Sequence, residues 1–258
     1  LFRIDHVIGF FRTWSILEEK GFFEPKKEKE QAERGRKILE KIIKNTGMLP
    51  CAEDLGTIPL FCRKEIEKLG IPGLDLAKNQ KNYRKIAVST LSTHDSNLYP
   101  AWLISQKKRV DRKIIKKTLK KVADSPCIFN ILIIFEWLFL GQAIKKENAF
   151  NYRINDPSRK RPENWSIRMP ISLEKLLNLS INRQIRKILE KHLESYVDEK
   201  GKERFDLAFN PEGLEEMNRN ITQLNNEKKH KPIYKVRIYE EGNKFSVGET
   251  GNNNKKLV

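Results

Sequence analysis

The chain has 258 residues, of which 38% are hydrophobic and 33% charged, and its formal net charge is +17 at pH 7. This composition excludes a collagen, a disulfide-rich scaffold and a fully disordered chain, and the length is ample for a core that folds independently. The longest apolar run, residues 128–140, is interrupted by Asn130 and Glu136 and is shorter than the roughly 20 residues that cross a bilayer, so we expect no membrane span.

In chain order, the first elements alternate between strands and helices. We predict a strand at residues 2–9, a helix at 28–45, a strand at 48–52, a helix at 57–69 and strands at 71–76 and 85–91. Gly47 lies just beyond the first helix and Pro59 lies near the first turn of the second, which are positions that these residue types favour.

Helices predominate in the next part of the chain. They are predicted at residues 98–105 and 110–123 from the helical spacing of apolar residues. An apolar run at 127–135 predicts either a further strand or a buried helix, because periodicity alone does not distinguish the two. A loop dense in Asn, Pro, Arg and Ser occupies 151–170, and a helix is predicted at 172–196.

Beyond Asp198 the sequence becomes richer in Asn, Glu and Lys. Within residues 231–247, apolar side chains alternate on both sides of Glu241-Gly-Asn, which predicts a hairpin. The polar end, residues 248–258, is expected to be disordered.

Repeated strand–helix units are typical of an α/β fold with a parallel sheet, either doubly wound or closed as a (β/α) barrel. The predicted strands are too few for an eight-stranded barrel. The chain also begins without Met, inside the apolar run Leu1-Phe-Arg-Ile. We therefore expect it to be a piece of a longer protein.

The three cysteines, Cys51, Cys62 and Cys127, are odd in number and match no zinc-binding spacing. They predict reduced thiols in a cytoplasmic protein. The N-terminus lacks the charged and apolar regions of a secretory signal. Because there is no Gly-rich phosphate loop and no metal-ligand cluster, we expect no metal and no organic cofactor.

The densest basic stretch, residues 107–121, invites a nucleic-acid hypothesis. Its apolar residues lie on one helical face, which favours a helix that buries this face and leaves its lysines in water. It contains no aromatic residue on which bases could stack. We expect no nucleic-acid partner, and a binder of nucleic acid or of anionic surfaces stays an alternative.

Acidic residues follow three predicted strands: Asp5, the pair Glu53 and Asp54, and Asp95. In a (β/α) barrel these strand ends form the active-site face. Carboxylates are costly to bury, so three of them in this context indicate a polar cleft.

Paired carboxylates suit glycoside transfer. A retaining enzyme uses a carboxylate nucleophile and a carboxylic acid roughly 5 to 5.5 Å apart. Arg3 lies on the same strand face as Asp5 and would favour an ionised nucleophile. The apolar residues before Glu53 would favour a protonated acid. A third carboxylate can hold sugar hydroxyls in the transition state.

Three motifs follow one another: Arg3-Ile-Asp-His-Val-Ile-Gly-Phe-Phe-Arg, Ala52-Glu-Asp-Leu-Gly-Thr-Ile-Pro and Ser92-Thr-His-Asp-Ser. In order and spacing they resemble the fourth, fifth and seventh barrel strands of the 4-α-glucanotransferases, the amylomaltases or disproportionating enzymes of glycoside hydrolase family 77. Residues 153–157 and 164–174 look like the later loop and closing helix of this family. The resemblance covers roughly residues 1–195.

The resemblance implies a fold of the (β/α)8 TIM-barrel type, of which this chain has only the second half. Residues 1–197 would be the C-terminal half of the catalytic domain, with about strands 4 to 8 and the helices after them. Residues 198–258 would be a basic, partly disordered extension. At Phe135-Glu136 the chain departs from the Gln-Asp pair that is usual in the family.

The resemblance also implies catalytic roles: Asp5 as nucleophile, Glu53 as general acid/base and Asp95 as transition-state stabiliser. Arg3 would be the partner of Asp5. Substrate-binding residues would be Arg3, Asp54, His94, Asn155 and Trp165. Trp14 could stack on a sugar ring or pack in the core, and the sequence leaves both open.

The implied activity is transfer of α-1,4-glucan segments between maltooligosaccharides by a retaining double displacement, with maltooligosaccharides as partners and no cofactor. Two alternatives remain within the resemblance. One is a related retaining α-glucan hydrolase, and the other is a truncated, inactive remnant of the transferase.

Overall fold

The computed structural model describes residues 1–46, 48–78, 82–189, 193–197, 203–207, 216–217, 219–220, 237–241 and 244–248. The chain divides into two compact units. Unit 1 consists of Leu1–Leu74, Lys85–Val88 and Phe209–Val258. Unit 2 consists of Asp75–Arg84 and Ser89–Ala208.

Two parallel strands lie at the centre of unit 1. β1 (Phe2–Ile4) pairs with β4 (Pro50–Ala52), with Ile4 opposite Ala52. The Ala52 amide donates to the Pro72 carbonyl, just before β5 (Gly73–Leu76). The strand predicted at residues 2–9 is shorter than expected, because His6 takes a left-handed conformation (φ 45°) and a 3-10 helix, Val7–Phe10, follows.

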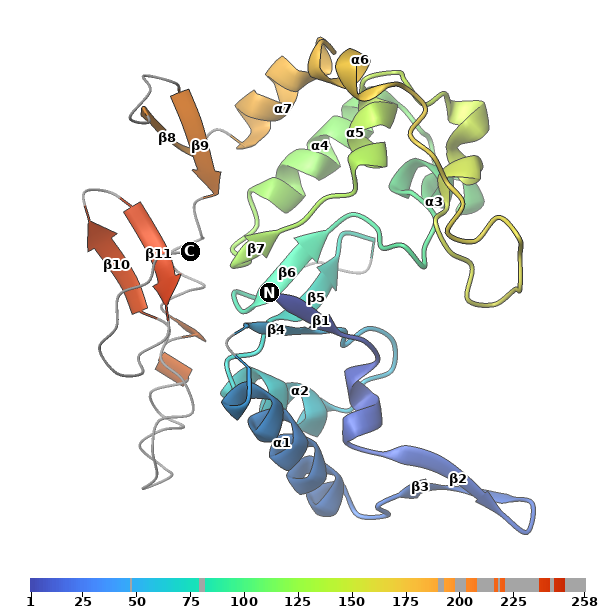
Figure 1. The fold of residues 1–258 in the computed structure, drawn as a ribbon. Helices are drawn as coiled ribbons and strands as arrows, with labels where there is room; N and C mark the ends of the chain where they lie inside the picture. Colours follow the sequence, from blue (N-terminus) through green and yellow to red (C-terminus); the bar gives the residue numbers. More distant parts are fainter. Residues whose placement is uncertain are drawn as a thin grey trace. The chain divides into compact units, whose positions relative to one another are not determined.

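Two helices cover the apolar side of this pair, α1 (Glu28–Lys44) and α2 (Leu60–Lys68), and they pack against each other (Figure 1). Both helices confirm the predicted segments to within three residues at each end. Gly35 of α1 lies on the ring of Phe11, and a Cβ at this position would be 2.2 Å from that ring. The shared core has these buried members: Ile4, Val7, Ile8, Phe11, Leu39, Ile43, Ala52, Cys62, Ile66, Leu69 and Ile71.

The sequence did not predict the antiparallel hairpin of β2 (Thr13–Leu17) and β3 (Lys20–Glu24). Its turn residues, Glu18 and Glu19, both have positive φ, where Asn and Gly are the usual residues. The sequence of this turn therefore does not predict a hairpin. Trp14 lies opposite Phe23, with ring centroids 4.8 Å apart, and is 56% exposed, so it does not pack in a core.

A three-stranded sheet has the order β5-β6-β7, with β6 (Ala87–Thr90) in the middle and β7 (Phe129–Asn130) beside it. The ambiguous run at residues 127–135 therefore supplies both a two-residue strand and the start of helix α5 (Ile134–Leu140). α5 is buried from Phe135 to Leu140. A helix that is buried on every side has no polar face, which is why periodicity left it ambiguous.

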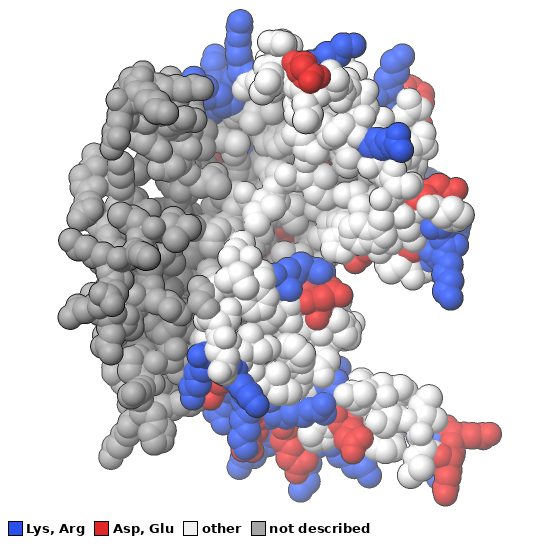
Figure 2. Space-filling view, viewed as in Figure 1, with Lys and Arg blue, Asp and Glu red and all other residues white. Residues whose placement is uncertain are grey.

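The helices of unit 2 include α3 (Tyr99–Ser105) and α4 (Arg112–Ala123), close to their predicted bounds. α4 buries Ile115, Leu119 and Val122 and packs on α5 (Figure 1). Its lysines are exposed, which confirms the amphipathic helix. On the face drawn in Figure 2, basic and acidic side chains are interspersed. On this face, the mixture of charges does not favour nucleic-acid binding.

The helix predicted at residues 172–196 is only partly correct. α6 (Leu173–Leu177) and α7 (Ile181–Leu189) are helical, but Leu193–Val197 forms strand β8, antiparallel to β9 (Glu203–Leu207). The helical segment is interrupted at residues 178–180, and the side-chain amide of Asn182 in α7 donates to the carbonyls of Leu176 and Leu177 at the end of α6. A strand at the end of this segment depends on pairing with a later segment, which local spacing does not reveal.

The hairpin predicted within residues 231–247 is confirmed. β10 (Arg237–Glu241) pairs with β11 (Lys244–Gly248), and Ile238 lies opposite Val247. Of the end expected to be disordered, residues 248–258, Gly248 belongs to β11, and residues 249–258 lie outside the described residues.

Cys51, Cys62 and Cys127 are free and buried. The described helices include none that is long and apolar enough to cross a membrane. In the same part of the chain, no group of His, Cys, Asp and Glu is arranged to hold a metal ion.

Candidate functional site

Asp5 and Glu53 directly follow the paired strands β1 and β4 of unit 1. Because Ile4 lies opposite Ala52, Asp5 and Glu53 take the next equivalent positions. The Glu53 amide donates to the Ile4 carbonyl at 2.9 Å, and the Val7 amide donates to the Glu53 carbonyl at 3.3 Å. These bonds extend the parallel ladder beyond the strands and bring the two acidic residues to one edge.

Asp5 is the more exposed of these acids, with 74% of its side chain accessible. Its Oδ1 lies 2.8 Å from Nη1 of Arg3, whose side chain is 36% exposed. Alternation along β1 places both side chains on one face, as the sequence predicts. Asp5 is therefore an accessible carboxylate with a cationic partner, which is what a nucleophile for an anomeric carbon requires.

Main-chain amides orient the carboxylate of Glu53. Its Oε2 accepts a hydrogen bond from the His6 amide at 2.9 Å, and its Oε1 accepts one from the Leu55 amide at 3.2 Å. His6 has φ 45°, a left-handed conformation that is uncommon outside Gly and in which Asn, Asp and His are enriched. The unusual conformation of His6 thus accompanies its hydrogen bond to Glu53.

Asp54, which the resemblance implies as a substrate-binding residue, lies buried just after β4. The residue is only 1% exposed, and its Oδ1 accepts a hydrogen bond from the Leu74 amide at 2.8 Å. Nη2 of Arg63 donates to its carbonyl at 3.2 Å. The bond from Leu74 joins the segment after β4 to β5. Substrate binding by Asp54 stays a prediction.

His94 and Asp95 lie after β6 in unit 2, where they form a second polar cluster. Nε2 of His94 is 3.1 Å from Oδ2 of Asp95, and the Asn155 side-chain amide donates to Oδ1 at 2.6 Å. The Asn155 main-chain amide also donates to the His94 carbonyl at 2.8 Å. Both carboxylate oxygens of Asp95 are thus held, and its side chain remains 36% exposed.

Trp165 belongs to the same cluster. Its ring centroid is 5.2 Å from that of His94, with the planes tilted by 33°, and the residue is 66% exposed. Its amide donates to the Ile154 carbonyl at 2.8 Å, which folds the loop back on itself. The structure therefore brings together the four residues that the sequence singled out in this part of the chain: His94, Asp95, Asn155 and Trp165.

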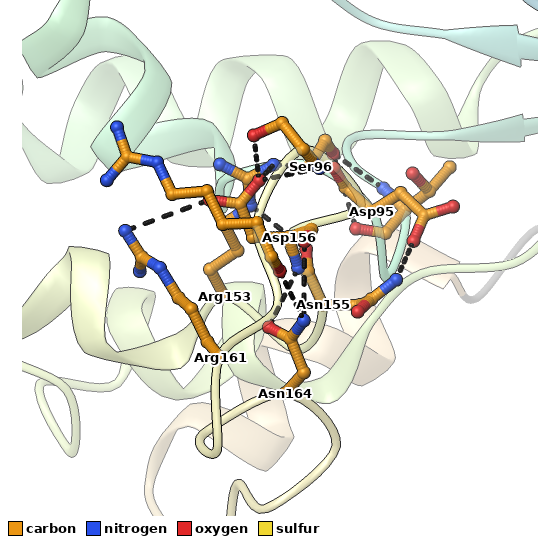
Figure 3. A network of polar contacts seen from close by, with 10 residues as sticks. Asp95, Ser96, Arg153, Asn155, Asp156, Arg161 and Asn164 are labelled. Atoms are coloured by element: carbon orange, nitrogen blue, oxygen red, sulfur yellow. Dashed lines mark hydrogen bonds and ion pairs between the residues drawn. The ribbon is translucent and has the colours of Figure 1, made fainter.

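The sequence did not identify the residues that hold this loop in place (Figure 3). Arg153 donates to the Asp95 carbonyl at 3.1 Å and to the Asn155 carbonyl at 3.0 Å. It also pairs with the buried Asp156 at 3.1 Å. The Asn164 side-chain oxygen accepts from the Asp156 amide at 3.0 Å. The polar residues of Arg153-Ile-Asn-Asp were the available signal, but the contact of Arg153 with Asp95 joins segments 58 residues apart.

Buried Asp156 remains charged because its partners favour the ionised form. Its carboxylate accepts a hydrogen bond from the Ser158 hydroxyl at 2.6 Å. This bond, together with Arg153 and Arg161, holds the pKa of Asp156 below its usual range. The ion pair of Arg153 and Asp156 therefore holds the loop, and the same Arg153 donates to the Asp95 carbonyl.

Comparison with known proteins extends these observations. A family model described as 4-alpha-glucanotransferase, glycoside hydrolase family 77, matches residues 1–174. The 4-alpha-glucanotransferase of Chlamydia pneumoniae is 32% identical over 218 residues, covering 73% of this chain and 41% of the relative. That of Chlamydia muridarum is 31% identical over 205 residues, covering 68% and 39%. The chain spans about two fifths of the length of the curated relatives that it matches.

A solved structure agrees in fold. The amylomaltase from Streptococcus agalactiae, in complex with acarbose, superposes with a TM-score of 0.51 at 18% identity, over 73% of this chain and 41% of that chain. The family match includes both polar clusters, around Asp5 and Glu53 and around His94 and Asp95. The chain belongs to the 4-α-glucanotransferases of glycoside hydrolase family 77.

Proposed function

We propose that this chain carries the catalytic carboxylates of a 4-α-glucanotransferase that transfers α-1,4-glucan segments between maltooligosaccharides. The observation that supports this best is the pair Asp5 and Glu53. They occupy equivalent positions after two paired parallel strands, within a segment that matches the family. Such a pair supplies the nucleophile and the acid of a retaining glycoside transfer.

In the proposed first step, Asp5 attacks the anomeric carbon while Glu53 protonates the leaving oxygen, which gives a β-glucosyl ester on Asp5. In the second step, Glu53 removes the proton from the acceptor 4-hydroxyl, which attacks the same carbon and releases Asp5. Two inversions leave the configuration retained. The hydrogen bonds from His6 and Leu55 support this role by fixing the direction of Glu53.

We assign Asp95 the stabilisation of the transition state, and His94, Asn155 and Trp165 contacts with the sugar. Asp95 is partly exposed and held by Asn155 and His94, so it is oriented before a ligand binds. Trp165 presents an exposed ring to solvent, as expected of a residue that stacks on a sugar. We assign Arg3 the role of electrostatic partner to Asp5.

The same proposal extends to the domain. We infer that residues 1–197 are the C-terminal half of a (β/α)8 catalytic domain and that residues 198–258 are an extension. The parallel β1–β4 pair, the order β5-β6-β7 and the likeness to an amylomaltase support a run of consecutive barrel strands. The three free cysteines support the expectation of a cytoplasmic protein.

The test is incubation of the chain with maltotriose, followed by separation of the products by size. Glucose together with oligomers longer than maltotriose is the expected result, and Asp5→Ala serves as the blank. Glucose and maltose alone would favour the hydrolase, and folded protein without turnover would reject the activity for this chain. Glu147→Gln, which changes an exposed acid outside both clusters, is the matched control.

A further inference from the structure

Glu136 is a fully buried acid that has no part in the proposed reaction. It lies in α5 among the buried side chains of Phe135, Trp137 and Leu138. Burial of a carboxyl group costs free energy unless hydrogen bonds compensate it. Its presence in an otherwise apolar helix therefore indicates a specific contact.

That contact is with both ends of one loop. Oε1 of Glu136 accepts a hydrogen bond from the Ser92 hydroxyl at 2.6 Å and another from the Tyr99 amide at 2.9 Å. Ser92 opens the segment that carries His94 and Asp95, and Tyr99 begins α3 at the end of that segment. A single carboxyl oxygen thus joins the two ends of residues 92–99.

The other oxygen, Oε2, has no hydrogen-bond partner within the described part of the chain. Burial raises the pKa of Glu136 to about 7, while the bonds from Ser92 and Tyr99 oppose this shift. The protonated acid keeps Oε1 as an acceptor, so it holds the loop without placing a charge in the core.

Loop 92–99 is held independently on its other side. Asn155 and Arg153 contact Asp95 and the main chain of His94, but they bind the middle of the segment and not its ends. The Ser96 hydroxyl closes the turn locally by accepting from the Thr93 amide at 2.9 Å. Two bonds to Glu136 tie the ends of the segment to α5. At the Ser92 end, the Thr90 hydroxyl also donates to the Ser92 carbonyl at 2.9 Å, a bond that stays within the main-chain neighbourhood of β6.

We propose that Glu136 is a positioning residue of the glucan site: it clamps the two ends of residues 92–99 and thereby fixes the direction of His94 and Asp95. This inference rests on the proposed function of Asp95. Glu136 acts through the loop and does not contact the substrate.

The test compares three variants with the unsubstituted chain. Glu136→Leu removes both hydrogen bonds and keeps an apolar side chain of similar size. Glu136→Gln keeps the Oε1 acceptor, and Ser92→Ala removes one bond without changing the core. Glu147→Gln is again the exposed control. Amide hydrogen exchange by mass spectrometry and the kcat and KM of maltotriose transfer are measured on each.

For Glu136→Leu we expect exchange in residues 92–99 to rise by about tenfold or more, and kcat to fall by about tenfold with KM nearly unchanged. Glu136→Gln should restore most of the protection and kcat, and Ser92→Ala should lie between the two. A purely structural residue would change exchange across the whole of unit 2 and would leave kcat per folded molecule unchanged.

A folded Glu136→Leu chain with unchanged exchange at residues 92–99 would overturn the proposal, and so would increased exchange with an unchanged kcat. If Glu136→Leu does not fold, the same two measurements on Ser92→Ala decide: unchanged exchange at residues 92–99, or increased exchange with an unchanged kcat, would overturn the proposal. Absence of turnover in the unsubstituted chain would count against the proposed function, and the exchange data would still decide whether Glu136 clamps the loop.

Discussion

At Glu53, the main chain sets the direction of the carboxylate. Amides of His6 and Leu55 donate to its two oxygens, so no long side chain has to be ordered to hold it. Asp5 differs, because its carboxylate is exposed and bound by one flexible guanidinium. An exposed ion pair of this kind contributes little to folding stability. The carboxylate of Glu53 is thus held by the main chain, whereas that of Asp5 is held by one side chain and is open to solvent.

This difference predicts separable effects of substitution. Glu53→Gln removes the proton donor, and we expect the rate of maltotriose transfer to fall by about 10²- to 10⁴-fold. An α-maltosyl fluoride donor does not need protonation of its leaving group, so the first step should survive in this variant. Release of fluoride in a burst measures that step.

Asp5→Asn is the matched comparison, because it removes the nucleophile and should abolish fluoride release from the same donor. Equal loss of fluoride release in both variants would contradict the separate roles of the two acids.

Glu136 predicts a pH dependence of stability. Its pKa in the folded chain is raised to about 7 from an ordinary value near 4.5, so the folded state binds this proton more tightly than the unfolded state does. The contribution of Glu136 to the free energy of unfolding is fully present below about pH 4.5 and is lost as the pH rises to about 7. Urea unfolding at pH 5 and pH 8 measures the change.

We expect the free energy of unfolding to fall by about 2 to 3 kcal/mol more in the unsubstituted chain than in Glu136→Gln between these pH values. Equal pH dependence in the two proteins would show that Glu136 does not titrate differently on folding.

At the level of elements, two glycines lie against aromatic rings in different surroundings. A Cβ at Gly35 of α1 would lie 2.2 Å from the ring of Phe11, which is completely buried. A Cβ at Gly21 of β3 would lie 2.0 Å from the ring of Trp14, which is 56% exposed. The buried ring is confined by the core, whereas the exposed ring has solvent into which it can turn.

Gly35→Ala should therefore destabilise the chain, although alanine is the better helix residue by about 1 kcal/mol. Overpacking costs typically about 1 to 3 kcal/mol or more, and a clash this close lies at the upper end. Gly21→Ala should change the free energy of unfolding much less and instead alter the fluorescence of Trp14. Urea titrations of the two variants followed by circular dichroism make the comparison, and similar destabilisation would contradict it.

At the scale of the whole molecule, the buried thiols report on the two units separately. Burial raises the pKa of Cys51 and of Cys62, both in unit 1, to about 12, and that of Cys127, in unit 2, to about 11. Because the thiolate is the reactive form, all three should resist thiol reagents in the folded chain.

We expect labelling by a maleimide at pH 7 to be slow and to accelerate at the urea concentration where each unit opens. Mass spectrometry of the labelled peptides assigns a labelling rate to each cysteine. Equal rates for all three cysteines at every urea concentration would indicate that the units unfold together. Rapid labelling without urea would contradict the buried positions.

The sequence pointed to more of the candidate site residues than of the residues that hold them in place. Asp5, Glu53 and Asp95 stand in contiguous motifs. Asp5 and Glu53 come directly after β1 and β4, and the motif of Asp95 follows β6. Such local patterns are present before folding, so the sequence alone points to these acids and to the family. The α1 and α2 helices were predictable for the same reason, since each shows one apolar face.

Only the tertiary structure decided the contacts of Asp54 and Glu136, the contact of Arg153 with the Asp95 main chain, and the strand at Leu193–Val197. Asp54 and Glu136 are acids like the others in the sequence, but in the structure both are buried, and one accepts a hydrogen bond from Leu74 and the other from Ser92. β8 requires β9 as its partner. Burial and long-range pairing arise when distant segments meet, and local sequence carries no record of which segments these are.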